Sequence, residues 1–507
     1  MSEDESGDGL SSLGSISQGA VYFLGGKGFQ NIVGFVSNLI LTRVLGTALY
    51  GIFSYLSVVF SLFMILTRLG GNKAVLRFIP EYKDDPKMRN AMLTLAYGTS
   101  FVASCIVAIL VFRFAPIISA LTLDESLFVD VLRVGAFVLP FNTLANITNA
   151  GFKALERMDY NVTVSSVVSP LLRLVFVGGA VLLGYSVIGA VAGLVVCGML
   201  TFFIGLFILI QKTNLGLARQ LSKSQATEYY DFSLPITFNQ AGNFLYNRVD
   251  LLMVGMFLTA SAVGIYRVAL LVTMILALPQ TAFNQLFPPI ASRLYHGEEK
   301  TELSELYTTV TRWTFTISFA PALGVILYAP EVLSVFGEGF SKGILVLTFF
   351  VFSQIVNNAV GPSGHLLMMS GYQNLAMVNQ LTFCILNLVL NYFLIIEFGF
   401  VGAAAATASV LTAVNAIRVV EIWYLEGIHP YNKSYVKPLV SGGVSVVVMY
   451  GVSLSLNGYA QLLIGGALGA LSFLFTLYLF GFEEQELKFI RKGRSRIKHI
   501  LSALGDS

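Results

Sequence analysis

Residues 232–255 read FSLPITFNQAGNFLYNRVDLLMVG, and this stretch decides how the chain folds. It is long and apolar enough to cross a bilayer as a helix, which takes ~20 predominantly apolar residues. Asn239, Asn243 and Asn247 nevertheless recur every four positions, and Asp250 follows three residues later. That spacing places all four polar side chains on one face of a helix.

This polar stripe has two open interpretations. Lipid cannot satisfy such side chains, so the stripe must face either other protein or a water-filled cavity. In the first interpretation the amides form hydrogen bonds between packed helices. In the second they line a cavity, and the rest of the chain has to decide between the two.

The composition of the whole chain is that of a polytopic membrane protein. Of its 507 residues, 55% are hydrophobic and 12% are charged, and the mean hydropathy is +0.76. Soluble globular proteins carry about 25% charged residues. The net charge of +3 is too small to indicate a nucleic acid partner.

Apolar runs predict fourteen helical spans, and no loop is long enough for a separate soluble domain. The spans are 19–41, 50–69, 91–112, 127–150, 161–183, 188–210, 232–257, 263–290, 309–329, 343–362, 376–396, 402–423, 436–456 and 460–482. The predicted fold class is therefore an all-α polytopic membrane protein.

Loop charges predict the orientation of these spans. If the N-terminus is cytoplasmic, the cytoplasmic segments contain 21 lysines and arginines, whereas the outer segments contain Arg43, Arg113 and Lys342. The positive-inside rule then places both termini in the cytoplasm. We expect the protein to be a multi-pass protein of the cell membrane.

The two halves of the chain resemble each other at one offset of 213 residues. The matching segments are 50–53 with 263–266, 160–161 with 373–374, and 189–190 with 402–403. Three matches at one offset suggest a duplicated unit of six spans. Because six is even, each copy starts on the same side, and an axis along the membrane normal relates the copies.

This duplication predicts two pseudo-symmetric six-helix lobes with additional segments. The predicted parts are a disordered tail at 1–15, an N-lobe with spans 1–6 at 16–231, a C-lobe with spans 7–12 at 232–430, spans 13 and 14 at 431–482, and a basic cytoplasmic tail at 483–507.

Charged residues inside the predicted spans fall into paired and unpaired groups. A cation at the centre of a helix costs ~2.5–3.5 kcal/mol on insertion scales. Asp130 with Arg133, and Arg418 with Glu421, are i,i+3 neighbours that can neutralise each other. The other cations inside or at the edges of spans are Lys27, Arg68, Arg173, Arg248 and Arg267.

Lys27, Arg68 and Arg267 have no carboxylate close to them in the sequence. Unpaired cations that face an internal cavity suit an anionic cargo, of which a diphosphate is one example. We interpret these three as candidate cargo-binding residues. Arg173 has the alternative of pairing with a distant acid or a lipid headgroup.

Amide side chains extend the polar pattern to other spans. Asn142 and Asn146 share a face of span 4, and under the offset Gln30 in span 1 lies opposite Asn243. Such neutral donors and acceptors suit hydroxyl-rich sugars, and interhelical hydrogen bonding is the alternative. A third group on one face of span 11 is Gln380, Asn387 and Asn391.

Several motifs resemble one family of membrane transporters. The segments LG at 45–46 and YGIFS at 50–54, RFIPEY at 77–82, PPI at 288–290 and GFVGAAA at 399–405 are similar to segments of the polysaccharide-export flippases. These are the Wzx-like members of the multidrug/oligosaccharidyl-lipid/polysaccharide (MOP) exporter superfamily. The motifs occur in the family's order along nearly the whole chain.

The resemblance implies two six-helix lobes around a central cavity, with two extra helices. It implies that the protein flips an oligosaccharide linked to a polyprenyl or dolichyl phosphate by alternating access. The family's cavity cations match Lys27, Arg68 and, roughly, Arg267 in position. The alternative is a drug/cation antiporter of the same superfamily, which would favour buried unpaired acids.

We expect no enzyme activity, catalytic residues, metal or cofactor, since no nucleophile–base set or metal-ligand spacing occurs. A coupling ion, H⁺ or Na⁺, is left open. The expected partners are a lipid-linked oligosaccharide, membrane lipids and glycosyltransferases or a polymerase of the same pathway, with the protein as a monomer. A non-transporting membrane scaffold is a further alternative.

Overall fold

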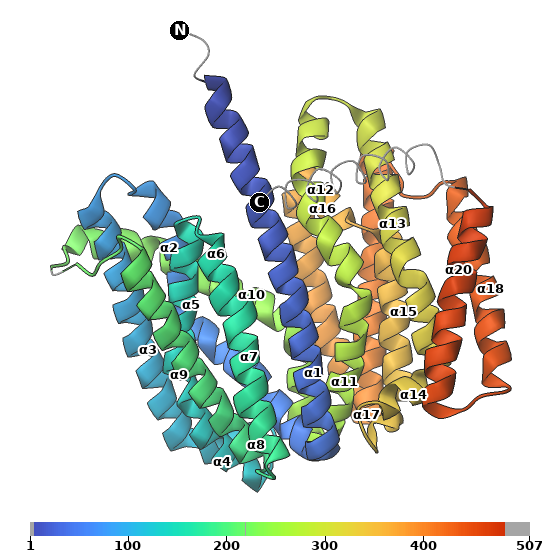
Figure 1. The fold of residues 1–507 in the computed structure, drawn as a ribbon, viewed down its shortest axis with the longest axis horizontal. Helices are drawn as coiled ribbons and strands as arrows, with labels where there is room; N and C mark the ends of the chain where they lie inside the picture. Colours follow the sequence, from blue (N-terminus) through green and yellow to red (C-terminus); the bar gives the residue numbers. More distant parts are fainter. Residues whose placement is uncertain (1–4, 219, 482–507) are drawn as a thin grey trace, which may run out of the picture. The chain divides into compact units, whose positions relative to one another are not determined.

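Every regular element in the described part of the chain is a helix, as the sequence predicts. The structure is a computed structural model that describes residues 5–218 and 220–481, with side chains described from Gly25 onward (Figure 1). The predicted tail at 483–507 and residues 1–4 of the other predicted tail lie outside the described residues.

The first half of the described chain runs to the end of α11, and π-helical turns interrupt its fifth predicted span. The helices are α1 (Glu5–Arg68), α2 (Gly71–Glu81), α3 (Pro86–Leu121), α4 (Ser126–Ala136), α5 (Val138–Ala154), α6 (Met158–Asn161), η1 (Val162–Val168), α7 (Ser169–Arg173), η2 (Leu174–Gly178), α8 (Gly179–Leu182), α9 (Val187–Lys212), α10 (Lys223–Phe257) and α11 (Ala260–Leu276).

The second half contains the long helix α17 and ends in two helices that pack together. Its elements are α12 (Leu278–His296), α13 (Lys300–Leu327), α14 (Ala329–Ser334), η3 (Phe340–Gly343), α15 (Ile344–Val360), α16 (Ser363–Met369), α17 (Gln373–Glu426), η4 (Lys433–Tyr435), α18 (Val436–Ser453), α19 (Gly458–Ala460), η5 (Gln461–Gly465) and α20 (Gly466–Leu479).

The chain is a multi-pass membrane protein. Among the described residues, nine helices are long and apolar enough to cross a membrane, or up to 11 if each of two bent helix pairs forms one span. The bent pairs are α4 with α5, at 45°, and α11 with α12, at 52°.

A glycine breaks each of the two longest helices. Gly46 in α1 has φ 69° and ψ −174°, and Gly399 in α17 has φ 60° and ψ −142°. Side chains with a Cβ rarely enter this backbone region. Both breaks fall where the sequence predicts that one span ends and the next begins. If α1 and α17 each count as two spans, each bent pair counts as one span and α10 also crosses, the total is fourteen. This count stays a prediction.

The helices gather into two compact units. Unit 1 comprises Met1–Leu271, Ser334–Val346 and Cys384–Thr407. Unit 2 comprises Val272–Leu333, Leu347–Phe383 and Ala408–Ser507. These units reflect packing, whereas the predicted lobes at 16–231 and 232–430 reflect duplication, and the lobe boundaries stay a prediction.

A core in unit 1 forms where α2, α3, α5 and α9 lie side by side (Figure 1). Val75, Phe78, Ala96 and Ile147 are buried there. The apolar residues of α2 recur at helical spacing, so they share one face of this short helix, and that face packs against the core.

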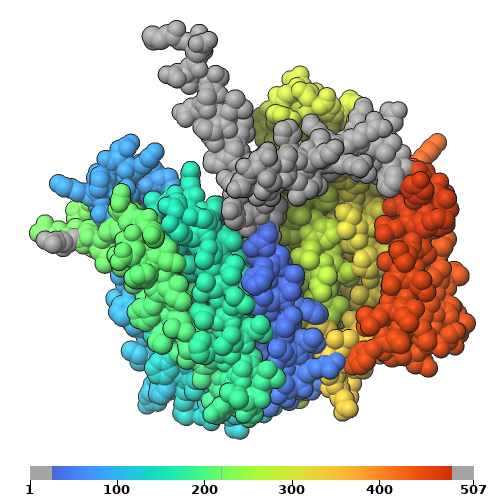
Figure 2. Space-filling view, in the orientation of Figure 1, coloured from blue at the N-terminus to red at the C-terminus, as the bar shows by residue number. Residues whose placement is uncertain are grey.

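Unit 2 has its own core between α12, α13, α16 and the end of α17. Phe287, Leu366 and Ile422 are buried in it, and the hydroxyl of Tyr307 donates to the carbonyl of Val360 at 3.0 Å. Further along the chain, α18 and α20 pack along each other, and Figure 2 shows them together at the red end of the colour scale.

Candidate functional site

A cavity of about 240 Å³ inside unit 1 brings three arginines together. Arg173 comes from α7, Arg248 from α10 and Arg267 from α11. The remaining lining residues are Asn38, Phe53, Ser54, Ser57, Val58, Ser61 and Phe244. Three cations from three different helices therefore converge on one small polar space.

The second part of α1 supplies the hydroxyl groups of the cavity. Ser54, Ser57 and Ser61 follow one another at intervals of three and four residues, so they share one face of the helix. Ser57 donates to the carbonyl of Phe53 at 2.9 Å, and Ser61 donates to the carbonyl of Ser57 at 2.7 Å. Both hydroxyls donate to backbone carbonyls of their own helix. The guanidinium groups are therefore the main hydrogen-bond donors toward the cavity.

Asn38 is held in place by its neighbours. Its Nδ2 donates to the carbonyl of Gly34 at 2.7 Å, and its Oδ1 accepts a hydrogen bond from the Tyr50 hydroxyl at 3.0 Å. Tyr50 is fully buried, so this bond fixes the orientation of the amide. The wall formed by α1 is therefore ordered before any ligand binds.

Arg173 is positioned by an irregular backbone. It ends α7, and π-helical turns precede and follow that short helix. Single π-helical turns inside α-helices are frequent at functional sites. The guanidinium lies 5.9 Å from the ring centre of Phe53, and its Nε is buried without a hydrogen-bond partner in the described part of the chain.

The cavity is strongly electropositive. Among the described residues, no ion pair involves Arg173, Arg248 or Arg267. None of the described side chains that line the cavity is acidic. Clustered cations in a poorly solvated space repel one another, so a bound anion would relieve both the repulsion and the cost of burial. Arginine in particular binds phosphate oxygens through paired N–H donors.

Of the three cations that the sequence singles out, the structure places Arg267 in this cavity. Lys27 donates to Oε1 of Gln30 at 3.0 Å on the exposed side of α1. Arg68 donates from Nε to the carbonyl of Met64 at 2.8 Å and from Nη1 to Oδ1 of Asn146 at 3.4 Å. A cargo role for Lys27, Gln30 and Arg68 stays a prediction.

The asparagines of α5 pack at helix contacts. Asn146 donates to the carbonyl of Asn142 at 2.8 Å. The Oδ1 atom of Asn142 lies so close to Gly198 of α9 that a Cβ added there would approach it to 2.5 Å. The first contact lies within α5, whereas the contact of Asn142 with α9 fits polar packing between helices, which was the alternative interpretation. A cargo role for Asn142 and Asn146 stays a prediction.

The stripe in α10 is divided between two environments. Asn243 donates to Oδ1 of Asn239 at 2.9 Å, and Asn247 donates to the carbonyl of Asn243 at 2.7 Å, and all three are exposed. Asp250 is only 6% exposed and accepts a hydrogen bond from the Tyr266 hydroxyl at 2.7 Å. Tyr266 of α11 contacts α10 at Asp250, which explains why Asp250 is buried whereas the three asparagines are exposed. That the stripe lines a water-filled path stays a prediction.

Sequence reasoning did not select Arg173 and Arg248 as site residues. Both were recognised as cations inside spans, but helical spacing within one segment cannot say which other segment packs against it. The serine spacing in α1 was a usable signal, because Ser54, Ser57 and Ser61 form a polar stripe that begins at the last residue of the YGIFS motif. The expected Asp130–Arg133 ion pair is confirmed at 3.6 Å.

Residues 16–294, more than half of the 507-residue chain, match the model of a family described as polysaccharide biosynthesis protein. The chain belongs to that family. The matched region contains the three arginines of the cavity and every site residue that the sequence predicts.

Named relatives of this chain include a protein of Haloferax volcanii. Agl15 of Haloferax volcanii, named as a probable low-salt glycan biosynthesis flippase, is 28% identical over 306 residues. The match covers 59% of this chain and 64% of Agl15, so the chain spans less than two thirds of that relative's length.

Solved structures with the same fold include a lipid flippase and a transporter of the MOP superfamily. The lipid II flippase MurJ in an inward closed conformation has a TM-score of 0.74 at 14% identity, covering 91% of this chain and 98% of MurJ. An inward-facing MATE family multidrug resistance transporter has a TM-score of 0.64 at 13% identity, covering 78% and 94%. The chain therefore shares the fold of these two proteins.

Proposed function

We propose that the protein moves a lipid-linked oligosaccharide across the cell membrane by alternating access. The observation that carries the proposal is the cavity in which Arg173, Arg248 and Arg267 meet without a carboxylate among the described lining residues. A diphosphate or phosphate that joins a glycan to its lipid carrier is the anion that such a cavity suits. Family membership and the name of Agl15 support the same class of cargo.

The transport step needs no covalent chemistry. The arginines hold the phosphate groups in a polar space while the hydrocarbon tail of the carrier stays in the lipid. Exchange between conformations that open to either side then moves the headgroup from the cytoplasmic leaflet to the outer leaflet. The protein acts as a transporter, not an enzyme, and works with the glycosyltransferases or polymerase that build the glycan.

The same proposal sets the location and orientation of the protein. The protein lies in the cell membrane, and both of its termini lie in the cytoplasm. This orientation places 21 lysines and arginines in the cytoplasmic segments, as the positive-inside rule requires. A monomer suffices, since the three arginines that form the cavity belong to one chain.

A MATE-like drug/cation antiporter is the second candidate, because one solved structure of the same fold is a MATE family transporter. Cationic drugs would need acidic groups in the binding cavity, and the described lining of this cavity has none. We expect cells that express the protein to show no added ethidium efflux. Efflux that disappears in Asp250→Asn would favour the antiporter.

The deciding experiment uses a strain that lacks the gene. Glycan-loaded carrier lipid should accumulate in the cytoplasmic leaflet, measured by its inaccessibility to an impermeant glycosidase in intact spheroplasts. The wild-type gene should restore accessibility, and the triple variant Arg173→Gln, Arg248→Gln and Arg267→Gln should not. Arg133→Gln, a paired and exposed arginine, is the matched control and should restore it.

Two results would overturn the proposal. One is a deletion strain in which no loaded lipid is trapped. The other is full restoration by the triple variant when it is expressed at the wild-type level.

A further inference from the structure

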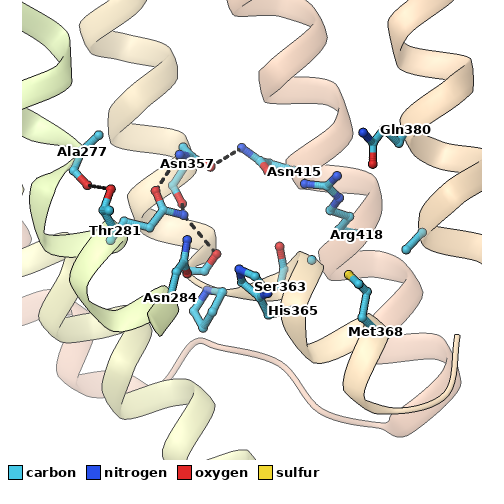
Figure 3. Close-up of a pocket in the computed structure, with 15 residues that line it drawn as sticks. Ala277, Thr281, Asn284, Asn357, Ser363, His365, Met368, Gln380, Asn415 and Arg418 are labelled. Carbon is cyan, nitrogen blue, oxygen red and sulfur yellow. Dashed lines mark hydrogen bonds between the residues drawn. The ribbon is translucent and has the colours of Figure 1, made fainter. Parts of the chain in front are cut away.

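Unit 2 contains a second and larger polar cavity, of about 400 Å³. It lies between α12, the end of α15, α16 and the two parts of α17 (Figure 3). Sites for small ligands are typically ~300–1,000 Å³, so this volume is sufficient for a specific ligand.

A hydrogen-bonded set of amides holds one wall of this cavity in place. Asn357 donates to Oε1 of Gln280 at 2.6 Å and accepts from Asn415 at 3.0 Å. Gln280, only 8% exposed, also donates to the carbonyl of Gly361 at 3.3 Å. These bonds join α12, α15 and α17 (Figure 3), so the wall is ordered without a ligand.

Two polar atoms at this cavity have no partner of their own. Nε of Arg418 and Oδ1 of Asn284 are buried, and neither makes a hydrogen bond within the described part of the chain. Burying such groups unsatisfied costs about 1–3 kcal/mol each. A ligand that accepts from the guanidinium and donates to the amide oxygen would remove both costs.

Arg418 does not form the ion pair that the sequence predicts. Glu421 instead accepts a hydrogen bond from Asn379 at 2.7 Å, and among the described residues Arg418 has no carboxylate within ion-pair distance. The guanidinium lies over Gly364, where an added Cβ would approach Nη1 to 3.5 Å. The i,i+3 prediction was wrong because the first part of α17 supplies a competing donor to Glu421, which leaves the charge of Arg418 at the cavity.

The remaining lining residues fit the other surfaces of a sugar. Pro362, Met368 and Ala376 supply apolar contacts, which suit the C–H faces of a pyranose ring. None of the described lining residues is Asp or Glu, so an anionic ligand meets no like charge there. The lining of this cavity therefore suits a ligand that has several hydroxyl groups and one negatively charged group.

We propose that this cavity binds a sugar residue that carries a negative charge, as a uronate does. Arg418 pairs with the anionic group, and Asn284 accepts from a ring hydroxyl. The assignment of that sugar to a lipid-linked glycan rests on the proposed function. The site is separate in sequence and composition from the arginine cavity of unit 1, which suits phosphate groups.

The test measures binding to the purified full chain in lipid nanodiscs, by ligand-detected NMR and by the shift of the thermal unfolding midpoint. The probes are glucuronate, glucose and inorganic phosphate at equal ionic strength. Glucuronate should bind at least tenfold more tightly than glucose, and phosphate should not displace it. Tenfold corresponds to about 1.4 kcal/mol.

Variants connect the binding to this cavity. Arg418→Gln should weaken glucuronate binding at least tenfold and leave glucose binding nearly unchanged. Asn284→Ala should weaken both sugars, and it replaces the first variant if Arg418→Gln does not fold. Arg293→Gln removes an exposed arginine at the end of α12 and is the matched control that should bind like the wild type.

The site is overturned if glucuronate does not bind the wild type, or if it binds the folded Arg418 and Asn284 variants equally well. Displacement of glucuronate by phosphate would also overturn it, since the site would then select a bare anion. Binding is measured without transport, so a chain that binds glucuronate and fails the deletion-strain assay contradicts the proposed function and leaves this site standing.

Discussion

Gly51 and Gly264 meet where the second part of α1 crosses α11. A Cβ atom added to Gly51 would lie 1.8 Å from the carbonyl oxygen of Ala260, and one added to Gly264 would lie 2.1 Å from that of Thr47. The two backbones therefore touch, as they do at small-x-x-x-small crossings of membrane helices. A hydrogen bond from Ser261 to Thr47 at 2.8 Å closes the same crossing.

This contact is reciprocal at the offset predicted from the sequence. Thr47 corresponds to Ala260, and Gly51 corresponds to Gly264, each 213 residues apart. Gly51 contacts the carbonyl of Ala260, and Gly264 contacts the carbonyl of Thr47, so the two contacts exchange under the offset. This is the pattern of a two-fold contact between like surfaces. The crossing thus supports the duplication and places it at a point where substitution can be tested.

Replacing either glycine of the crossing should destabilise the protein. Gly51→Ala and Gly264→Ala each force a Cβ against a backbone carbonyl that cannot move aside, with an expected cost of about 1–3 kcal/mol. The thermal unfolding midpoint in detergent measures this cost. Gly34→Ala, where the new Cβ meets nothing within 4 Å, is the control on the same helix. Equal midpoints for all three variants would contradict the crossing.

The helix breaks at Gly46 and Gly399 should be equally sensitive, for a different reason. Both have a positive φ and an added Cβ would meet nothing within 4 Å, so a substitution is strained by backbone conformation alone. We expect Gly46→Ala and Gly399→Ala to cost about 1–3 kcal/mol each in chemical unfolding. Gly98→Ala, inside α3 and also without close neighbours, should be neutral or stabilising. A matching loss in Gly98→Ala would show that the breaks are not special.

The buried hydrogen bond between Tyr266 and Asp250 should contribute to stability. Tyr266→Phe removes the donor and leaves a carboxyl oxygen unsatisfied in a site that is 6% exposed, which should cost about 1–3 kcal/mol. Asp250→Asn should cost less, since the amide oxygen still accepts the bond. Tyr450→Phe, at an exposed tyrosine, serves as the control in the same unfolding assay. A wild-type midpoint for Tyr266→Phe would show that this bond is not needed.

Single changes in the arginine cavity should slow transport more than changes at the other predicted cations. Arg248→Gln and Arg267→Gln should each reduce flipping of a fluorescent polyprenyl-diphosphate glycan in vesicles by ~10-fold, which corresponds to about 1.4 kcal/mol.

Replacing Arg173 by Lys tests geometry, because lysine keeps the charge and loses the paired N–H donors. We expect Arg173→Lys to slow flipping, and Lys27→Gln and Arg68→Gln to have smaller effects. If Lys27→Gln were instead the slowest variant, the result would contradict the assignment of the phosphate site to this cavity.

Much of the fold follows from local sequence patterns. The breaks at Gly46 and Gly399 lie in the gaps between predicted spans because glycine and the end of an apolar run are both local features. The Asp130–Arg133 pair was predictable for the same reason, since an i,i+3 distance is set within one helix.

The members of the candidate site could be predicted only in part. Helical periodicity says which residues share a face, and the lack of a nearby carboxylate in the sequence made Arg267 a candidate. It does not say which helix lies opposite that face. The serines of α1, the π-turns around Arg173 and the position of Arg248 become one site only because segments that are distant in the sequence pack together.

The sequence by itself determined that the chain is a helical multi-pass membrane protein and which cations lie inside its predicted spans, and it predicts a repeat of the two halves at an offset of 213 residues. Tertiary structure decided which of those cations meet, that Asp250 pairs with Tyr266, and that Arg418 faces a cavity and not Glu421. The physical reason is that hydropathy and periodicity act along one helix, whereas a site depends on which helices pack together.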